Sequence, residues 1–394
     1  MTAGCPPPRD FLNPSSIQTT NSQNIPMTHT ALVTAALVLF ANLAHAAPKL
    51  AEVYVNAETG NDGNSGADKA VAFKTLKRAV ESISASGTIH LAAGNVFREC
   101  LELRVGGAEG QPLTVEGNGA VIDLGTDITD GPWEQLGEEW VLARDVRPHT
   151  RPVQASPIFV DNTPIWVVHE KDPKDAPSGG LRFLENGRYV IKFPAGKSPK
   201  NSRVTLTSDE QTPGVLLEAG ASHILIRNLT TRYVGNDGFN LHGSGRDIVL
   251  ENIKALMCGD QGISSHDSGQ MTIRGAEVAF CGSRAGGIAD INDCVTSYSN
   301  VLLHNNRKPV LTLRGGKHEI DGMVIVAPNA NALPKPSDKI SVKNCIVVNA
   351  DFEQISASAD AEQEKVKGLI EAARQAKPLL DTVPYLGVPL SQNP

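Results

Sequence analysis

The sequence predicts an all-β solenoid, in which short repeats wind into stacked coils of parallel strands. The chain repeats itself about every twenty-four residues between positions 223 and 341. Each repeat holds short apolar or alternating runs, such as residues 224–226 and 248–250, and such runs are typical of strands. Gly, Asn, Asp and Ser separate the runs, as they do in turns. A unit this small cannot bury its own apolar side chains, so neighbouring repeats must stack.

This stacking relates residues that occupy equivalent positions in successive repeats. The repeats begin at His223, Arg246, Gln270, Cys294 and Lys317. Residues one period apart become neighbours across a ladder spacing of about 4.8 Å. Candidate functional residues can therefore be sought in columns that cross successive coils.

Composition limits the domain count and the kind of partner. The chain has 394 residues, of which 40% are hydrophobic and 36 are glycines. This is enough for one long domain or two ordinary ones. The formal net charge of -7 argues against a nucleic-acid partner, because binding to phosphates requires a basic surface.

The N-terminal segment predicts export. Residues 31–46 form an apolar stretch that is short for a bilayer span and ends in Ala44-His45-Ala46, a small-x-small cleavage pattern. We interpret residues 27–46 as a secretory signal and residues 1–26 as a polar extension that is disordered or not native to the protein. The protein is then expected to be secreted or periplasmic, without a stable membrane span after cleavage. An uncleaved membrane anchor is the alternative.

Five cysteines follow this signal, and two of them are spaced by one repeat. Cys258 and Cys281 each precede a glycine. The ladder spacing would put their Cα atoms within reach of a disulfide bond. The alternative is a ladder of buried thiols that pack as small apolar groups.

Residues 47–125 are predicted to form an N-terminal cap and the first coils. A strand at 53–55 precedes the turn-rich sequence GNDGNSG, an amphipathic helix at 73–83 and a strand at 88–91. This order resembles the N-terminal entry of secreted right-handed parallel β-helix proteins of the pectate-lyase superfamily. The resemblance implies that the helix caps the open end of the solenoid and hides the apolar interior of the first coil.

A β-rich insertion is predicted to interrupt the coils. Strands at 113–116 and 120–124 belong to the first coils, and then the period is lost. Over residues 126–207 aromatic residues cluster among short strand-like runs, which favours a compact β module beside the solenoid. Its three tryptophans either contact a substrate or form the core of the module.

The remaining chain completes the solenoid and its far end. Residues 208–350 carry the parallel coils, and the strand pattern stops after them. Within the C-terminal part, residues 351–394, apolar positions at helical spacing predict a helix at 359–377 that covers the far end, followed by an extended tail.

Two columns gather polar residues along one flank of the predicted coils. One period added repeatedly to Asn236 leads to Asp260, Arg284 and Lys308, and Asp237 stands beside this column. The second column pairs His242 with His266, and the turns that follow it contain Asp267 and Asp293. Arg314 lies one strand past Lys308 and is a further candidate.

Such a flank is suited to β-elimination in a uronic-acid polysaccharide. Proton removal next to the sugar carboxylate needs that carboxylate to be neutralised, and a second group must take the proton. The base is predicted to be Lys308, Arg284 or Arg307. The oxygen ligands of a Ca²⁺ ion would be Asp237, Asp260, Asp267 and Asp293. Arg307, His242, His266 and Arg314 would then bind substrate. This chemistry resembles the calcium-dependent, lysine-based members of the superfamily.

Hydrolysis is the second reaction that the pattern allows. The order GNDG at 235–238, GDQG at 259–262, AGGI at 285–288 and Arg307-Lys308 resembles polygalacturonase-type glycoside hydrolases. Two positions depart from that family. Gln261 stands where the resemblance implies a second acid, and Gly286 stands where it implies a histidine. Asp237 and Asp260 alone would have to serve as acid and base.

A reading without catalysis explains the same residues. Asn, Asp and Gly at coil corners cap turns through their own backbone, and charges of alternating sign make favourable cross-strand pairs. The chain would then be a monomeric glycan-binding or cell-surface protein. This architecture also supports non-catalytic functions. By analogy, our leading hypothesis is a secreted, monomeric carbohydrate-active enzyme that cleaves an acidic polysaccharide by β-elimination, with hydrolysis and glycan binding as the alternatives.

Overall fold

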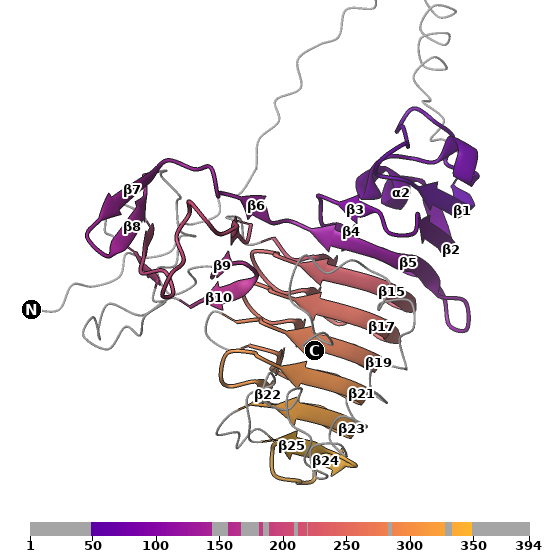
Figure 1. Ribbon diagram of the computed structural model, residues 1–394. Helices are drawn as coiled ribbons and strands as arrows, with labels where there is room; N and C mark the ends of the chain where they lie inside the picture. Colours follow the sequence, from indigo (N-terminus) through magenta and orange to yellow (C-terminus); the bar gives the residue numbers. More distant parts are fainter. Residues whose placement is uncertain are drawn as a thin grey trace, which may run out of the picture. The chain divides into compact units, whose positions relative to one another are not determined.

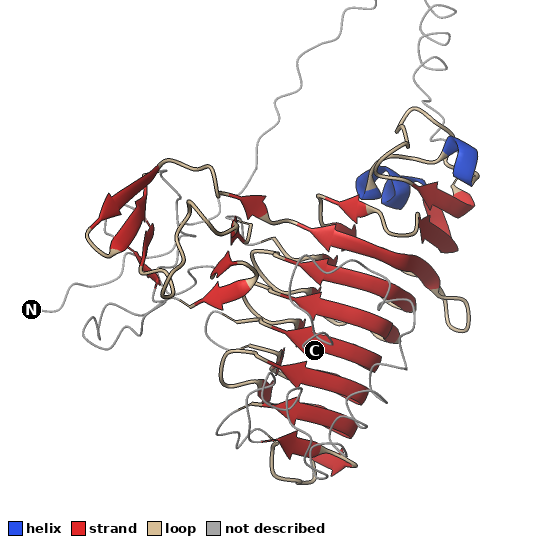
Figure 2. Cartoon of the chain, in the orientation of Figure 1, coloured by secondary structure: helices blue, strands red, loops and turns tan. Residues whose placement is uncertain are grey.

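The computed structural model describes residues 49–143, 157–166, 181–183, 189–208, 212–218, 220–282, 286–327 and 333–348. Within them the chain is all-β, and its parallel strands stack as a solenoid, as predicted (Figures 1 and 2). The extension at 1–26, the signal at 27–46 and the helix expected at 359–377 lie outside the described residues. No helix of the described part is long and apolar enough to cross a membrane.

One parallel sheet of eleven strands follows the stacking direction of the solenoid (Figure 1). Its strands are β1 (Leu50–Val55), β2 (Ile83–Leu91), β3 (Val96–Phe97), β5 (Leu113–Asp123), β15 (Ile224–Arg232), β17 (Ile248–Leu256), β19 (Gln270–Ala279), β21 (Val295–His304), β23 (Lys317–Val326), β24 (Ile340–Lys343) and β25 (Ile346–Val348). The main path of pairing is β1-β2-β5-β15-β17-β19-β21-β23-β24, so successive coils lie side by side.

A second parallel sheet of six short strands forms another wall. Its strands are β4 (Leu101–Leu103), β14 (Val215–Leu217), β16 (Phe239–Leu241), β18 (Ile263–Ser265), β20 (Ile288–Asp290) and β22 (Leu311–Leu313). Phe239 pairs with Ile263, Ile263 with Ile288 and Ile288 with Leu311. The repeat is therefore not constant from coil to coil, although it stays close to the predicted value.

Inward-facing apolar side chains from both sheets form one continuous core. Phe239 and Leu241 of the short sheet are buried with Ile224 and Ile226 of the long sheet. On each strand the inward residues alternate with outward ones, as the period of two requires. The alternating runs of the sequence are therefore explained by burial on one face of each sheet.

The helix α2 (Leu76–Ser82) closes the N-terminal end of this core. Its Leu76 and Ala79 belong to the same buried cluster as Val53 of β1. The helix is shorter than the predicted 73–83, because Thr75 acts as its N-cap and accepts a hydrogen bond from the backbone N–H of Arg78 at 3.1 Å. A 3-10 turn, η1 (Lys69–Val71), precedes it.

A residue in the left-handed backbone region recurs at the same level of successive coils, within the long strands or, at Asn344, between β24 and β25. These residues are Asn118, Asn228, Asn252, Gly275, Asn300, Gly322 and Asn344. Asn and Gly tolerate this conformation better than other residues. Nδ2 of Asn252 also donates a hydrogen bond to Oδ1 of Asn228 at 3.4 Å. Because of this bend, the two strands expected at 113–116 and 120–124 are one strand, β5.

The described part of the insertion holds two antiparallel four-stranded sheets. One sheet holds β6 (Thr126–Asp127), β13 (Val204–Leu206), β9 (Ile158–Val160) and β10 (Thr163–Ile165); the other holds β7 (Trp133–Leu136), β8 (Glu139–Leu142), β12 (Tyr189–Ile191) and β11 (Leu181–Phe183). They share a core of their own, in which Trp140 is buried and Trp133 packs against it. These two tryptophans serve packing, one of the two roles considered from the sequence.

The cysteines of the described residues are free thiols, so the expected disulfide between Cys258 and Cys281 is not formed. Both side chains are buried in the solenoid core. Sγ of Cys281 donates to the backbone carbonyl of Ala279 at 3.2 Å, and Sγ of Cys258 faces that of Leu256 at 3.7 Å. Sγ of Cys281 also lies 3.5 Å from the carbonyl oxygen of Ala255 on the preceding coil, so both thiols contact backbone carbonyls. The alternative of buried thiols is therefore correct.

Candidate functional site

The candidate site is the stack of turns that lead from each long strand to the next short strand. We call these turns, residues 233–238, 257–262, 280–287 and 305–310, the turn column. Backbone hydrogen bonds join them: Gly259 N–H donates to the Val234 carbonyl at 2.8 Å, and Arg307 N–H donates to the Cys281 carbonyl at 2.9 Å. The described residues of these turns are therefore stacked on one another through their backbones.

Each turn begins with a residue of positive φ that redirects the chain out of the long strand. These residues are Tyr233, Met257, Phe280 and Asn305. Three of them are bulky and are buried at 5% exposure or less. A non-glycine residue adopts this backbone only when its surroundings compensate the strain. Tight packing around the turn column provides this compensation.

Asp260 lies on the coil after Asn236, as the period predicts. The backbone N–H of Asp260 donates to the Asn236 carbonyl at 3.2 Å. Arg284, the next position of the predicted column, lies outside the described residues. Lys308 follows on a later coil and is exposed, and its neighbour Arg307 is half-buried. Burial lowers the pKa of Arg307.

Asp237 lies beneath the surface of the turn column. Its side chain accepts hydrogen bonds from the backbone N–H of Gln261 at 2.9 Å, Nδ2 of Asn240 at 2.8 Å and Oγ of Ser264 at 2.6 Å. Only 2% of the residue is exposed. Burial, and next the charge of Asp260, raise the pKa of Asp237 to about 7.

Gln261 links the two carboxyl groups. Its backbone N–H contacts Asp237, and its side-chain amide Nε2 donates a short hydrogen bond to Oδ1 of Asp260. In a polygalacturonase-type site this position would carry an acid. Here it carries a donor that holds both neighbouring carboxyl groups in place. The pair is thus one buried acid and one partly exposed acid, bridged by an amide.

The second predicted column lies at the opposite end of the short strands. The imidazole rings of His242 and His266 stack with centroids 4.4 Å apart and an interplanar angle of 5°. Oδ2 of Asp267 accepts from the Gly243 N–H at 2.8 Å, and the Asp293 N–H donates to the Asp267 carbonyl at 2.7 Å. Burial, and next the proximity of His242, lower the pKa of His266.

Arg314 belongs to this second column. Its backbone N–H donates to the carbonyl of Asp290 at 2.9 Å, just as the backbone N–H of His266 donates to the last residue of the preceding short strand. Arg314 therefore occupies the position of His266 two coils later. Its side chain is exposed. The structure therefore groups Arg314 with the histidines rather than with Lys308.

The four acids expected to bind calcium separate into two pairs. Asp237 and Asp260 precede the short strands β16 and β18, whereas Asp267 and Asp293 follow β18 and β20. Three internal donors already occupy the oxygens of Asp237. Among the described residues, no three His, Cys, Asp or Glu side chains gather closely enough to hold a metal ion. The described residues do not fit a calcium site built from these four acids.

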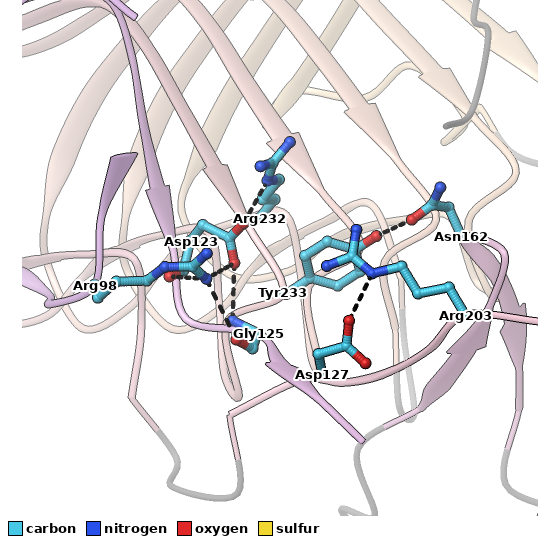
Figure 3. Close-up of polar contacts among 8 residues, drawn as sticks. All are labelled: Arg98, Asp123, Gly125, Asp127, Asn162, Arg203, Arg232 and Tyr233. Carbon is cyan, nitrogen blue, oxygen red and sulfur yellow. Dashed lines mark hydrogen bonds and ion pairs between the residues drawn. The ribbon is translucent and has the colours of Figure 1, made fainter. Parts of the chain in front are cut away.

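Sequence reasoning missed a buried ion-pair cluster where the solenoid meets the insertion. Figure 3 shows the Asp123 carboxylate between two arginines: Oδ2 accepts from Nε of Arg232 at 2.7 Å, and Oδ1 accepts from an Nη of Arg98 at 2.8 Å. Asp123 and Arg232 are buried, at 2% and 6% exposure. They are paired residues of β5 and β15. The insertion lies between them in the sequence, so the repeat could not relate them.

The same junction joins the insertion to the turn column. The ring of Tyr233, the first residue of the turn column, packs edge-on against Phe159 with centroids 5.2 Å apart. Its hydroxyl donates a short hydrogen bond to Oδ1 of Asn162, while Nε of Arg203 donates to Asp127 at 3.0 Å (Figure 3). A cavity of about 450 Å³, bordered by Arg98 and Thr212, opens here. The Thr212 carbonyl accepts from the Asn236 N–H at 3.3 Å, so the cavity lies one coil before Asn236.

A second buried charged group lies on the outer face of the long sheet. Nζ of Lys254 lies 3.2 Å from Oε2 of Glu277, and Oε1 of Glu277 lies 3.4 Å from Nε2 of His304. The three residues come from β17, β19 and β21 and are each less than 5% exposed. Charged residues within otherwise apolar strand ends were the sequence signal that could have indicated them.

Comparisons with known proteins concern the fold. A scan against protein-family models found no match, and a search of curated proteins found none either. XylC, solved with xylose, is 13% identical with a TM-score of 0.39 over 76% of this chain and 68% of that chain. A rhamnogalacturonan lyase is 14% identical with a TM-score of 0.38 over 76% of this chain and 74% of that chain. A GH136 lacto-N-biosidase from Eubacterium ramulus is 11% identical with a TM-score of 0.33 over 75% of this chain and 57% of that chain. These similarities concern the course of the chain and say nothing of its activity.

Proposed function

We propose that the protein is a carbohydrate-active enzyme that cleaves an acidic polysaccharide by β-elimination, with the turn column as its active site. The observation that carries the proposal is that Asp260, Arg307 and Lys308 stand in one stack of turns. Asp260 and Lys308 are separated by two ladder steps, which is about 10 Å. This spacing leaves room for a sugar unit between the acidic and the basic end of the column.

The cationic end of the column supplies what the elimination needs. A uronate C–H next to the carboxylate loses its proton more easily when a positive charge neutralises that carboxylate. The guanidinium of Arg307 provides this charge, and Lys308 takes the proton. The released electron pair forms a carbon-carbon double bond while the bond to the leaving sugar oxygen breaks, and that oxygen takes a proton from water.

Either basic residue is a candidate for the base, and they differ in exposure. Arg307 is half-buried, and its guanidinium stays charged, which suits it better to neutralising the sugar carboxylate. Lys308 is exposed and can move towards a bound sugar. Arg284, the other base expected from the sequence, lies outside the described residues and stays a prediction. No step of this proposal passes through calcium, whose role also stays a prediction.

Hydrolysis is the second candidate function, and one specific observation favours it. The pKa of Asp237 is raised to about 7 beside the carboxylate of Asp260. Two neighbouring carboxyl groups with separated pKa values are the usual acid and base of a glycoside hydrolase. Its weakness is access, because Asp237 is only 2% exposed. For this reason we place hydrolysis after elimination.

The proposed location follows from the proposed substrate. We propose that the protein is exported to the periplasm or the medium, where polysaccharides occur, and that it acts as a monomer. The support for export is the signal expected at residues 27–46. N-terminal sequencing of the protein recovered from the medium or the periplasm tests it, and a start near Ala47 is the expected result.

A product assay separates the functions. The mature protein is incubated with a panel of uronate polysaccharides, with and without Ca²⁺, and the ultraviolet absorbance of a new carbon-carbon double bond is followed. New reducing ends without this absorbance would replace elimination by hydrolysis. Retention on a polysaccharide gel without either product would make the protein a glycan-binding module.

A further inference from the structure

A cavity of about 450 Å³ lies near the N-terminal cap, on elements that the turn column does not include. Its lining comes from the end of β1, the segment after β2, the 3-10 turn η1 and the bend of β5. The volume is within the range of small-molecule sites. Nothing in the proposed reaction uses this cavity.

Two stacked rings form one wall of the cavity. Tyr54 and His90 are paired residues of the parallel strands β1 and β2. Their ring centroids are 4.7 Å apart with an interplanar angle of 14°. Nε2 of His90 forms a short hydrogen bond with Oε2 of Glu52, which fixes the imidazole beside the tyrosine. Because the rings stack face to face, each covers one face of the other. The wall is therefore aromatic and held in one orientation, and the ring face that His90 leaves uncovered on Tyr54 lies at the outermost strand of the sheet.

Polar groups without an internal partner border the same cavity. Within the described part of the chain, the Lys69 ammonium, the Tyr54 hydroxyl and Nδ2 of Asn56 form no hydrogen bond or ion pair. Oδ1 of Asn56 accepts the backbone N–H groups of Glu58 and Thr59, both at 3.0 Å, so the Nδ2 group of this amide is the end left to donate. The Lys69 side chain is exposed and carries a positive charge at the rim.

Apolar groups complete the lining. Leu91 and Ala72 border the cavity together with the aromatic wall. Asn118 is held in place, because its Nδ2 donates to the Leu91 carbonyl at 3.0 Å. The cavity therefore combines a rigid aromatic wall, an apolar floor, two uncharged donors and one cation.

We propose that this cavity binds an acidic pyranose unit of a glycan, as a second saccharide site separate from the turn column. A pyranose ring presents an apolar C–H face to an aromatic wall and hydroxyl groups to amide and phenol donors. Its carboxylate pairs with the Lys69 ammonium. Such a site holds a glycan chain on the protein without acting on it.

The affinity of the protein for a free uronate tests whether this cavity is a saccharide site. Isothermal titration of the mature protein with sodium galacturonate, and with galactose as its uncharged counterpart, is expected to show binding of the uronate alone. Lys69→Gln is expected to weaken galacturonate binding about tenfold, the effect of losing a charge-assisted hydrogen bond. Tyr54→Ala is expected to abolish the binding, while Tyr54→Phe keeps most of it.

Two matched controls keep the result specific. Lys77→Gln removes an exposed lysine of α2 that does not border the cavity, and it is expected to leave the affinity unchanged. Lys308→Ala removes the proposed base and is also expected to leave this affinity unchanged. The proposal of a second site and the proposal of the reaction can therefore be contradicted independently of each other. A thermal melt of each variant shows that it is folded.

Three binding results would overturn the proposal, and so would a fourth result in a control variant. They are the absence of galacturonate binding by the wild-type protein, equal binding of galactose and galacturonate, and galacturonate binding that survives both Lys69→Gln and Tyr54→Ala in folded protein. A loss of binding in Lys308→Ala would move the uronate to the turn column and would overturn it as well.

Discussion

Asp237 and Asp260 lie on consecutive coils, and the buried carboxyl of Asp237 senses the charge of Asp260. Burial first, and this neighbouring charge second, raise the pKa of Asp237 from 3.8 to about 7. Asp290, inside the solenoid, has its pKa raised to about 7 by burial as well. Two buried acids therefore bind protons more tightly in the folded chain than in the unfolded chain, with a direct consequence for stability.

The contribution of Asp237 and Asp290 to the free energy of unfolding is expected to fall as the pH rises from about 4 to about 7. The lowered pKa values of His266 and His318 act in the opposite direction, so this contribution is measured as the difference between the wild type and a variant. In this window the folded chain keeps protons on Asp237 and Asp290 that the unfolded chain has released. The stability that these protons contribute is complete below the pKa of the unfolded chain, and it is lost as the pH rises through the pKa of the folded chain. Denaturant unfolding across this pH range measures the slope. Asp237→Asn is expected to reduce the slope, because it removes one of the two titrating carboxyl groups. The new amide N–H can donate to Oδ1 of Asn240, which has no other hydrogen-bond partner, and this helps the variant to fold. Asp130→Asn, at an exposed position, is expected to leave the slope unchanged, and an equal slope in both variants would contradict the assignment.

Loss of Lys308 is expected to stop the reaction without affecting the fold. Because Lys308 is exposed, Lys308→Ala should melt like the wild type, while kcat falls about 100-fold or more if a general base is removed. The rate of double-bond absorbance measures this effect. Lys317→Ala, at an exposed lysine of β23, is the control and should keep the full rate. A Lys308→Ala enzyme with wild-type kcat would exclude Lys308 as the base.

The Asp123–Arg232 pair is expected to be important for stability. Asp123→Asn leaves the buried guanidinium of Arg232 without its carboxylate and should destabilise the protein by about 3 kcal/mol. Arg104→Met removes an exposed arginine that contacts Glu102 and Glu218, and it should cost about 1 kcal/mol or less. Urea unfolding of both variants tests the difference, and similar losses in the two would contradict it.

The bend at Asn252 is expected to tolerate glycine and to reject valine. Asn252 has a φ of 50°, and the equivalent position of the next coil is Gly275 with a φ of 74°. A β-branched side chain in this region costs about 2 kcal/mol, whereas glycine adopts it without a steric penalty. Thermal melts should therefore rank Asn252→Gly well above Asn252→Val. The reverse order would show that the side-chain bond to Asn228 outweighs the backbone conformation.

Reducing agent is expected to leave the melting temperature of the mature protein unchanged. The described cysteines are free, and Cys258 and Cys281 are buried in the core. A thiol reagent should label these two only after denaturation. A fall in the melting temperature on reduction would reveal a disulfide and contradict the thiol ladder.

The sequence indicated most of the fold because the coils obey simple periodicities. Ile224 and Ile248 were expected to be neighbours from their spacing alone, and they are paired residues of β15 and β17. The step from Asn236 to Asp260 followed from the same argument. At Asn118 the inward positions change from Leu113 and Val115 to Ala120 and Ile122, so the alternation is interrupted although the strand continues. For this reason the sequence suggested two strands where the structure has one.

The repeat could not reveal contacts between residues that an insertion or a short strand separates. Asp123 and Arg232 are paired although the whole insertion separates them in the sequence. The four acids assigned to one calcium site lie in the turns of successive repeats. A three-residue strand such as β18 nevertheless places Asp260 and Asp267 at its two opposite ends. Whether an acid is exposed, as for Asp237, depends on donors from several coils and is not visible in one segment.

The sequence by itself determined that this chain is a stack of β coils with an aromatic-rich insertion, because the alternation of apolar residues and the recurrence of turn residues are local properties. The tertiary structure alone decided which carboxyl groups are buried, which charges are paired, and that Tyr54, His90 and Lys69 border one cavity. Those properties depend on distances between coils and on the exclusion of water, and both arise only when the whole solenoid has closed around its core.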